Sequence, residues 1–421
     1  MKFRRYKMSE IATIAMSNVD KKTNEGETPV KLCNFVDVYR NWAITKDLIP
    51  SFMSATAKPQ EVERFTLSKG QVALTKDSET RDDIGIATYI ADNMDKVLLG
   101  YHCAVITPNS ALVDSKYLNA YMHSNIVHKY FENNASGSGQ RYTLSYNALL
   151  NIPVLLPDLE SQKEMGQIFS NIDRKIALNR QINDNLEAMA RQLYDYWFVQ
   201  FDFPNENGKP YKSNGGKMVW NEKLKRNIPN KWNNGILSNI ANITMGQSPD
   251  GSSYNENGNG TIFYQGSTDF GIRFPSIRKY TTAPSRFAKK GDILMSVRAP
   301  VGAMNIANND CCIGRGLTSL SSKVGSTTHL YYILDDLRMK FENINSAGTT
   351  FGALTKDGLY GLPVVVPSVD IIKQFEDICK PIFDKQMCIG EEINALTKQR
   401  DELLPLLMNG QATVNYHLSD D

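Results

Sequence analysis

The sequence Ile-Pro-Val-Leu-Leu-Pro at residues 152–157 recurs as Leu-Pro-Val-Val-Val-Pro at residues 362–367, an offset of 210 positions in a chain of 421. At the same offset, Phe-Glu-Asn at 131–133 recurs at 341–343. Two copies are too few for a solenoid, in which several repeats stack on one another. The chain is therefore expected to be a duplication with one globular domain in each half.

Each copy of the repeat is followed by a long stripe of apolar residues. From Met165 and from Ile371 the stripes keep a 4-3-4-3 spacing, which is typical of the seam between paired helices. We predict two matched helices that pack on each other, although each stripe would also fit packing on its own globular domain. Pro381 is expected to kink or split the second helix. The predicted seam residues are Met165, Phe169, Ile172, Ile176, Leu186, Leu193, Ile371, Phe375, Ile378, Ile382, Ile389, Leu396 and Leu403.

Short apolar runs bounded by Gly, Pro and Asn indicate strands and turns in both globular segments. The predicted fold class is α+β, with two mixed α/β domains separated by two long helices that pack as an antiparallel coiled coil, and with a pseudo-twofold internal repeat. The predicted boundaries are 1–156 for the first globular domain, 157–207 for a central helical region, 208–366 for a linker and the second globular domain, and 367–421 for a C-terminal helical region.

The net charge of +2 conceals an alternation along the chain. The four predicted segments carry +2, −4, +9 and −5 in order, counted from their Lys, Arg, Asp and Glu residues. A segment with a charge of +9 fits a polyanionic partner, and it also fits an ordinary solvated surface. The charge pattern supports two kinds of domain, each used twice.

The sequence lacks the patterns that catalysis requires. It contains no Gly-x-x-x-x-Gly-Lys-Ser/Thr loop, no Gly-x-Ser-x-Gly elbow and no His-x-x-x-His pair. It also contains no Pro-Pro, which an adenine methyltransferase would carry in its motif. A nuclease-like set, Pro-Asp at 157–158 and Asp-Arg-Lys at 173–175, would point around the predicted helix instead of into one pocket. We therefore predict no catalytic residue and no metal site.

The six cysteines lack any Cys-x-x-Cys spacing, which favours reduced thiols, and the adjacent Cys311 and Cys312 are expected to be a buried strand pair. No apolar run approaches the ~18 residues that a membrane-spanning helix needs. No apolar segment follows the basic first residues, so a secretory signal is not expected. These observations predict a cytoplasmic protein without a membrane partner.

The remaining interpretation is a binding protein with two recognition modules. Arg can contact guanine through two donors, and Gln or Asn can contact adenine. Loops rich in small polar residues carry such side chains in both halves, although an ordinary surface role stays open for each one. The candidate DNA-binding residues are Gln140, Arg141, Tyr142, Gln265, Ser267, Arg273, Arg298, Arg315, Thr349 and Thr350.

The segment Arg-Gln-Leu-Tyr-Asp-Tyr-Trp-Phe at 191–198, followed by Phe-Asp-Phe-Pro-Asn at 201–205, resembles the central conserved region of specificity (S) subunits of type I restriction–modification systems. Lys-Gly-Asp-Ile-Leu at 290–294 is similar to a motif inside the second target-recognition domain of that family. The resemblance covers essentially the whole chain. In the first domain, Leu-Thr-Lys-Asp at 74–77 stands where the second has Met-Ser-Val-Arg at 295–298.

This resemblance implies a DNA-recognition subunit that performs no catalysis itself. Each target-recognition domain would read one half of a split, asymmetric site on double-stranded DNA. The paired helices would bind two methyltransferase (M) subunits, and restriction (R) subunits would join the complex. The chain would bind no cofactor, while S-adenosylmethionine, ATP and Mg would belong to partner subunits. Two other functions stay open: a coiled-coil adaptor that binds only protein, and a single-chain nuclease or methyltransferase.

Overall fold

The chain divides into two compact units. The computed structural model describes residues 2–137, 139–346 and 354–414, with the backbone alone described for 338–346. Unit 1 comprises residues 1–178 and 394–421, and unit 2 comprises residues 179–393. Each unit thus combines one globular half of the chain with part of each long helix.

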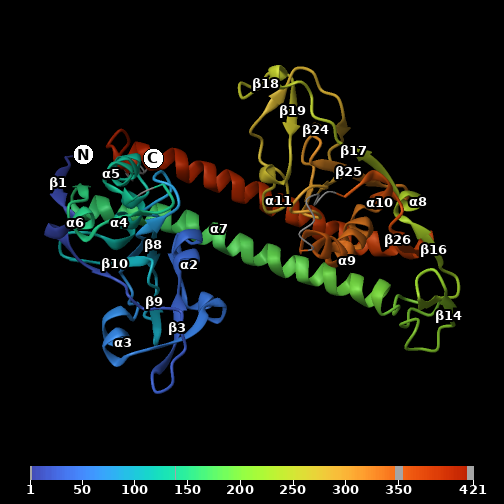
Figure 1. Ribbon diagram of the computed structural model, residues 1–421, viewed down its shortest axis with the longest axis horizontal. Coiled ribbons are helices and arrows are strands. Elements are labelled where there is room, and N and C mark those ends of the chain that lie inside the picture. The colour runs from blue at the N-terminus through green and yellow to red at the C-terminus, as the bar shows by residue number, and fades with distance from the viewer. Residues whose placement is uncertain (1, 138, 347–353, 415–421) are drawn as a thin grey trace, which may run out of the picture. The chain divides into compact units, whose positions relative to one another are not determined.

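Two long helices contribute to both units. They are α7 (Leu159–Tyr194) and α11 (Val369–Met408), drawn in green and red in Figure 1. The limits of the units fall inside these helices, so the predicted domain boundaries stay predictions. The expected split at Pro381 is wrong, because α11 is one helix. Pro381 lies on its exposed face, between the buried residues Cys379 and Phe383, whose packing offsets the missing backbone hydrogen bond.

Unit 1 is built on a five-stranded sheet with the order β2-β10-β6-β8-β4. All neighbouring pairs are antiparallel except β8 and β4. Every residue of β6 is buried, as expected for a central strand that packs on both faces. The strands are β2 (Ala12–Met16), β10 (Cys103–Pro108), β6 (Val72–Thr75), β8 (Ala87–Ile90) and β4 (Ala43–Ile44).

The other elements of unit 1 surround this sheet. A second sheet has the order β5-β3-β9, a small one has the order β11-β12-β7, and β1 pairs with β13. The remaining bounds in unit 1 are β5 (Met53–Ala57), β3 (Thr28–Cys33), β9 (Val97–Leu99), β11 (Ser136–Gly137), β12 (Tyr142–Thr143), β7 (Asp77–Ser78), β1 (Arg4–Lys7), β13 (Pro153–Leu156), α1 (Met8–Ile11), α2 (Phe35–Arg40), α3 (Pro59–Phe65), α4 (Ser115–Met122), α5 (Asn125–Asn134) and α6 (Tyr146–Leu150).

Unit 2 repeats the central sheet of unit 1 with four strands in the order β17-β25-β22-β23. A second sheet, β18-β20-β19-β24-β21, stands beside it, and the pair β16 and β26 repeats β1 and β13. The bounds are β17 (Ala241–Met245), β25 (Leu317–Ser322), β22 (Ile293–Ser296), β23 (Met304–Ile306), β18 (Tyr254–Asn255), β20 (Tyr280–Thr281), β19 (Thr261–Tyr264), β24 (Cys311–Ile313), β21 (Phe287–Ala288), β14 (Met218–Asn221), β15 (Arg226–Pro229), β16 (Asn233–Ile236), β26 (Pro363–Val366), α8 (Leu237–Ile240), α9 (Thr327–Ser346) and α10 (Lys356–Tyr360).

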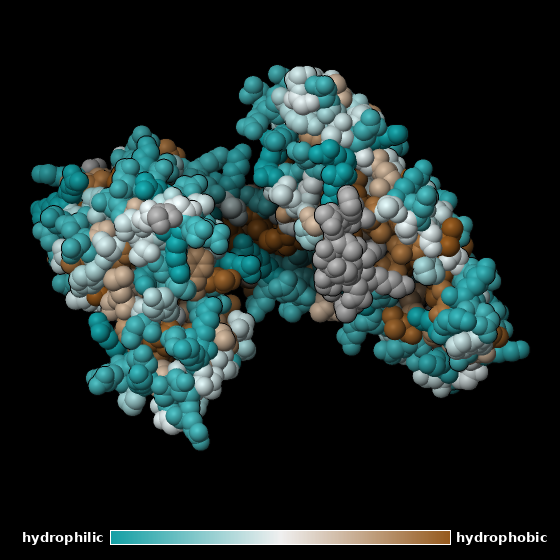
Figure 2. Space-filling view, in the orientation of Figure 1, coloured by the Kyte–Doolittle hydropathy of each residue, from teal (hydrophilic) through white to brown (hydrophobic). Residues whose placement is uncertain are grey.

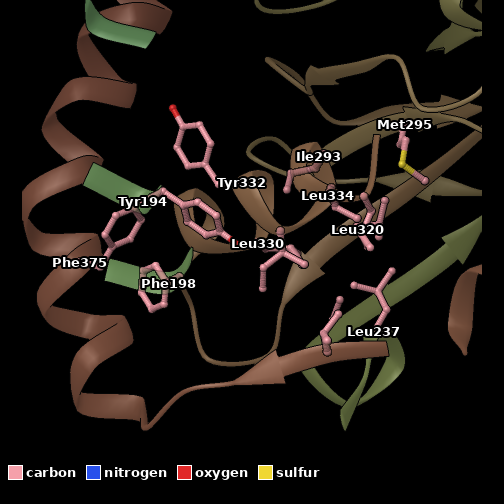
Figure 3. Close-up of a cluster of buried hydrophobic side chains, with 14 of the residues drawn as sticks. Tyr194, Phe198, Leu237, Ile293, Met295, Leu320, Leu330, Tyr332, Leu334 and Phe375 are labelled. Carbon is pink, nitrogen blue, oxygen red and sulfur yellow. The ribbon is translucent and has the colours of Figure 1, made fainter. Parts of the chain in front are cut away.

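The core of unit 2 joins the two long helices to the globular elements. Tyr194 from α7 and Phe198 from η2 (Asp195–Val199), the π-helical turn that follows α7, pack against Phe375 from α11. Tyr332 from α9 lies in the same cluster (Figure 3). The ring centroids of Phe198 and Phe375 are 5.0 Å apart in an edge-to-face arrangement. Tyr194, Trp197 and Phe198 of the aromatic segment at 191–198 are therefore core residues, and their large rings supply much of the buried apolar surface.

Within each unit, α7 and α11 run antiparallel. In unit 2, the Asn179 side chain donates to Glu392 (Nδ2–Oε2 2.9 Å). At the end of α7 the partner lies earlier in α11, because the Tyr194 and Phe375 ring centroids are 6.2 Å apart. In unit 1, Met165 and Phe169 share a buried cluster with Leu407. The antiparallel pairing expected from the 4-3-4-3 stripes is confirmed, and each helix also packs on the globular part of its unit.

Most predicted seam residues are covered. Met165, Phe169, Ile176, Ile371, Phe375 and Ile389 are buried, and Ile172, Leu186, Leu193, Ile382, Leu396 and Leu403 are partly buried. The prediction for Ile378 is wrong, because its side chain is 48% exposed, and Cys379 and Phe383 face the core instead. The reason is that α9 packs on the side of α11 that carries Phe383, where the Tyr331 and Phe383 ring centroids lie 5.3 Å apart. With this extra neighbour, the buried positions of α11 differ from those that a strict heptad repeat predicts.

Two further expectations concern cysteines and membranes. All six cysteines are free thiols, and Cys311 and Cys312 are both buried in β24, as predicted. Among the helices that the structure describes, none is both long and apolar enough to cross a bilayer.

Candidate nucleic-acid interface

Four of the predicted DNA-binding residues line one cleft in unit 2. Gln265, Ser267, Arg298 and Arg315 surround a volume of about 230 Å³, together with small neighbours such as Gly316. Gln265, Arg298 and Arg315 are exposed and Ser267 is half-buried. The loop after β19, the loop after β22 and the loop before β25 thus deliver their polar side chains to one place.

Backbone hydrogen bonds bring these three loops together. The Gly314 amide donates to the Tyr264 carbonyl (2.8 Å), and the Val297 amide donates to the Gly316 carbonyl (2.9 Å). A Cβ on Gly316 would lie 2.8 Å from the Gln265 carbonyl oxygen, so a residue with a side chain would push the loops apart. Glycine at this position allows the close approach on which the cleft depends.

Asp269 holds the turn that carries Gln265, a role that no local sequence pattern indicates. The Asp269 carboxylate is buried and accepts from the Gln265 amide (N–Oδ2 3.0 Å) and from the Arg278 guanidinium (Nε–Oδ1 2.8 Å). Both bonds come from donors within ten residues, so the loop is internally braced. The Gln265 side chain is thereby left exposed at the edge of the cleft.

The cleft is a surface of hydrogen-bond donors. Arg298 and Arg315 each offer a planar fork of N–H groups, and Gln265 offers both a donor and an acceptor. Such a set matches the acceptor edge of guanine and the mixed edge of adenine in the major groove of DNA. Figure 2 shows hydrophilic to neutral colours over the projecting end of unit 2 that carries β18.

The prediction that Arg273 contacts DNA is wrong. Arg273 is 6% exposed, and its guanidinium donates to Glu187 of α7 (Nη1–Oε2 2.8 Å) and to Gln386 of α11 (Nη2–Oε1 2.7 Å). The same guanidinium lies 4.3 Å from the centroid of the Phe383 ring. Arg273 therefore ties the globular part of unit 2 to both long helices. An arginine in a polar loop can turn inward where acceptors such as the buried Gln386 satisfy its guanidinium.

In unit 1, the predicted residues lie beside a polar cluster. Gln140 and Arg141 are exposed and Tyr142 is half-buried, at and just before β12. The Arg141 Nη2 atom lies 2.6 Å from Nδ1 of His102, which is not among the residues predicted from the sequence. His102 in turn lies 2.7 Å from the Asp77 carboxylate. The remaining candidates, Thr349 and Thr350, lie outside the residues that the structure describes.

A larger cleft in unit 2 contains none of the predicted DNA-binding residues. It has a volume of about 750 Å³ and is lined by residues of the aromatic segment, including Arg191 and Tyr194. Arg191 pairs with Asp335 (2.7 Å), Asp336 and Asp195 (3.0 Å), so its charge is more than balanced by carboxylates. An arginine engaged in this way links α7 to α9 and does not offer donors to DNA.

A known protein family matches most of the chain. The family model for the type I restriction modification DNA specificity domain matches residues 2–188 and 229–398. The chain belongs to this family. Each of its two units thus contains most of one DNA specificity domain, in agreement with the repeated strand order.

Individual relatives agree with this assignment. The chain is 28% identical over 365 residues to the putative type I restriction enzyme MjaX specificity subunit of Methanocaldococcus jannaschii, covering 85% of this chain and 82% of the relative. It is 24% identical to the type I restriction enzyme HindI specificity subunit of Haemophilus influenzae, covering 79% and 85%. In fold it is similar to the type I restriction–modification S subunit of M. genitalium, with a TM-score of 0.58 at 16% identity over 96% of each chain.

Proposed function

We propose that this chain selects the DNA site on which a type I restriction–modification complex acts, and that the chain performs no chemistry itself. The observation that carries the proposal is the donor-rich cleft of unit 2, in which Gln265, Arg298 and Arg315 converge from three loops. Membership of the DNA specificity family and the names of the relatives, which are specificity subunits of type I restriction enzymes, support it.

The duplication supports a target in two parts. Each unit carries its own exposed polar cluster, with two arginines around a cleft in unit 2 and Arg141 beside His102 in unit 1. Because the two clusters differ in chemistry, the two half-sites would differ in sequence. The recognised site is therefore proposed to be bipartite and asymmetric, with a spacer whose bases are not read.

The long helices are proposed to dock the two methyltransferase subunits, and restriction subunits would join this assembly. Several apolar side chains on α7 lie off the buried seam, among them Ile182 at 36% exposure and Met189 at 59%. Exposed apolar side chains on a helix that is otherwise polar outside its seam fit a protein partner. S-adenosylmethionine, ATP and Mg would be bound by the partner subunits, because this sequence lacks the motifs that bind them.

The test is to map N6-methyladenine across the genome of a methylation-deficient host that expresses the full chain with its methyltransferase partner. We expect one bipartite, asymmetric motif. Arg298→Ala combined with Arg315→Ala should relax bases in one half of that motif, because each bidentate contact discriminates by about 1–3 kcal/mol. Lys225→Ala is the control, since Lys225 is exposed on the β14–β15 hairpin and pairs with Glu222.

Three outcomes would contradict the proposal. A continuous palindromic motif would show that the two units do not read separate half-sites. A complex in which the double arginine variant and the wild-type chain produce the same motif would show that the cleft does not read DNA. A chain that binds its protein partner but confers no methylation motif would favour the adaptor function.

A further inference from the structure

The two units place the same three backbone positions around their recognition loops. In unit 2, the amide of Val297 donates to the Gly316 carbonyl and the amide of Leu354 donates to the Val297 carbonyl, at 2.9 and 2.8 Å. In unit 1, the amide of Lys76 donates to the His102 carbonyl (2.9 Å), and the amide of Leu144 donates to the Lys76 carbonyl (2.8 Å). Each position in one unit can therefore be matched to a position in the other.

This matching locates the counterpart of the unit 2 cleft. Arg298 follows Val297 as Asp77 follows Lys76, and Arg315 precedes Gly316 as Tyr101 precedes His102. The sequence correspondence between 74–77 and 295–298 is thus seen in the hydrogen bonding of the two units. Unit 1 places a carboxylate, a tyrosine and an imidazole where unit 2 places two arginines and a glycine.

We propose that Tyr101, His102 and Arg141 form the base-reading site of unit 1, and that Asp77 is the positioning residue for this site. The proposal rests on the DNA-recognition function proposed above and deepens it. The ligand is an edge of a base pair that presents acceptors, which in the major groove is guanine with O6 and N7.

Asp77 is a buried hydrogen-bond acceptor that holds other residues of the site in place. Its side chain is 10% exposed and its carboxylate accepts from Thr143 (Oγ1–Oδ1 2.6 Å) and from His102 (Nδ1–Oδ2 2.7 Å). Burial acts to raise the pKa of Asp77, but these hydrogen bonds and the charges of Lys76 and Arg141 outweigh it and hold the pKa below its ordinary value. Asp77 is thus an anion at neutral pH, and its hydrogen bond fixes the orientation of the imidazole.

Arg141 is the group that can turn to a ligand. Its side chain is 57% exposed, and its Nη2 atom lies 2.6 Å from His102 Nδ1 and 3.7 Å from the Asp77 carboxylate. The Nδ1 atom cannot donate to Asp77 and accept from Arg141 at the same time. His102 Nδ1 can therefore keep only one of these two hydrogen bonds. The Arg141 guanidinium is the more exposed partner, so it is the one that can leave His102 and bind a base.

The charge balance and the aromatic side chains favour such a ligand. Two basic side chains, Lys76 and Arg141, face the single carboxylate of Asp77, with N–O distances of 3.8 and 3.7 Å. Tyr101 is 50% exposed, and its ring packs edge-on against His102, with centroids 4.8 Å apart. The Lys76 Nζ atom lies 4.6 Å from the centre of the same ring. A cationic surface with a half-exposed phenol beside it suits both the bases and the negative potential of DNA.

The experiment maps methylated motifs for the full chain, co-expressed with its methyltransferase partner, with Arg141 replaced in two ways. Arg141→Ala removes both charge and fork, whereas Arg141→Lys keeps the charge and removes the fork. If Arg141 reads a base, both variants should relax one guanine position in one half of the motif by about 5- to 150-fold, and the other half should be unchanged. Arg64→Ala, on the exposed face of α3, is the matched control and should leave the motif intact.

Asp77→Asn tests the positioning role. It keeps the size of the side chain and its bond to Thr143, but weakens the hold on His102, so it should relax the same position as the Arg141 variants. If Asp77→Asn lowers the extent of methylation but leaves the sequence of the methylated motif unchanged, the positioning role is wrong. Rescue of the motif by Arg141→Lys would show a phosphate contact, and an unaltered motif in both Arg141 variants would show no contact, so each result would overturn the base-reading site. If the wild-type motif is not bipartite, the failure lies in the proposed function and not in this site.

Discussion

Replacing Phe375 by Ala should destabilise unit 2 strongly, whereas replacing Ile378 by Ala, three residues away on the same helix, should not. Phe375 is fully buried, and its ring lies 5.0 Å from Phe198, 5.8 Å from Trp197 and 6.2 Å from Tyr194. Ile378 is 48% exposed. The pair of variants therefore tests which face of α11 is buried.

The expected magnitude follows from the burial of the two side chains. Truncating a buried Phe costs about 3–5 kcal/mol, since both the transfer free energy and the new cavity contribute. For a unit of this size, that loss lowers the melting temperature by roughly 2–4 °C per kcal/mol, or about 6–20 °C in total. For Ile378→Ala the change in unfolding free energy should stay near the ~0.5 kcal/mol that is usual at surface positions.

Tryptophan fluorescence during thermal unfolding is the appropriate assay. Trp197 and Trp232 are both buried in the same cluster as Phe375, so their emission reports on this core. Equal losses for the two variants, or a larger loss for Ile378→Ala, would refute the orientation of α11 and with it the aromatic core described here.

Three further predictions concern single features of the chain. Arg273→Met should lower the unfolding temperature of unit 2, because Glu187 and Gln386 lose their hydrogen-bond donor. The methylated motif should stay unchanged, and a relaxed motif would show that Arg273 contacts DNA. Burial lowers the pKa of His329 to about 3. Below pH ~6.5 this imidazole therefore becomes protonated in the unfolded chain but stays neutral in the folded chain. The free energy of unfolding of unit 2 should consequently fall by about 2 kcal/mol between pH 7.5 and pH 5. His329→Gln should remove this part of the pH dependence in paired denaturation curves, and an identical dependence in the variant would contradict the assignment. The purified chain alone should neither methylate nor cut DNA, and methyl transfer from S-adenosylmethionine by the pure chain would overturn this prediction.

The repeat at 152–157 and 362–367 was sufficient to predict the duplication. Those segments form β13 and β26, and each leads directly into a long helix. Strands and turns of the two units also follow from local patterns, because alternation and Gly, Pro and Asn positions act over a few residues. The pairing order of the central sheet did not follow, since it depends on contacts between segments far apart in sequence.

The candidate site divides in the same way. Arg298 and Arg273 both occur in polar loops, and nothing local distinguishes the arginine that faces a cleft from the one that reaches Glu187 and Gln386. His102 was missed because it precedes an ordinary apolar strand and its partners Asp77 and Arg141 are distant in sequence. Extending the correspondence between the halves from residue 76 to residue 102 would have found it.

The heptad count failed at Ile378 for a related reason. A seam counted at 3.5 residues per turn describes two helices that contact only each other. In unit 2, α9 adds a third surface, and Phe383 packs against Tyr331 of that helix. Sequence periodicity could locate the helix but not the extra neighbour that decides its buried face.

The most direct test of the account is a segment exchange. Residues 1–156 of the full chain would be replaced by the matching segment of a relative with a known target, and the methylated motif would be mapped with the same methyltransferase partner. We predict that one half of a bipartite motif changes to that of the relative, while the other half and the spacer length are retained. A chimera that changes both halves, or neither, would contradict the claim that each unit reads its own half-site.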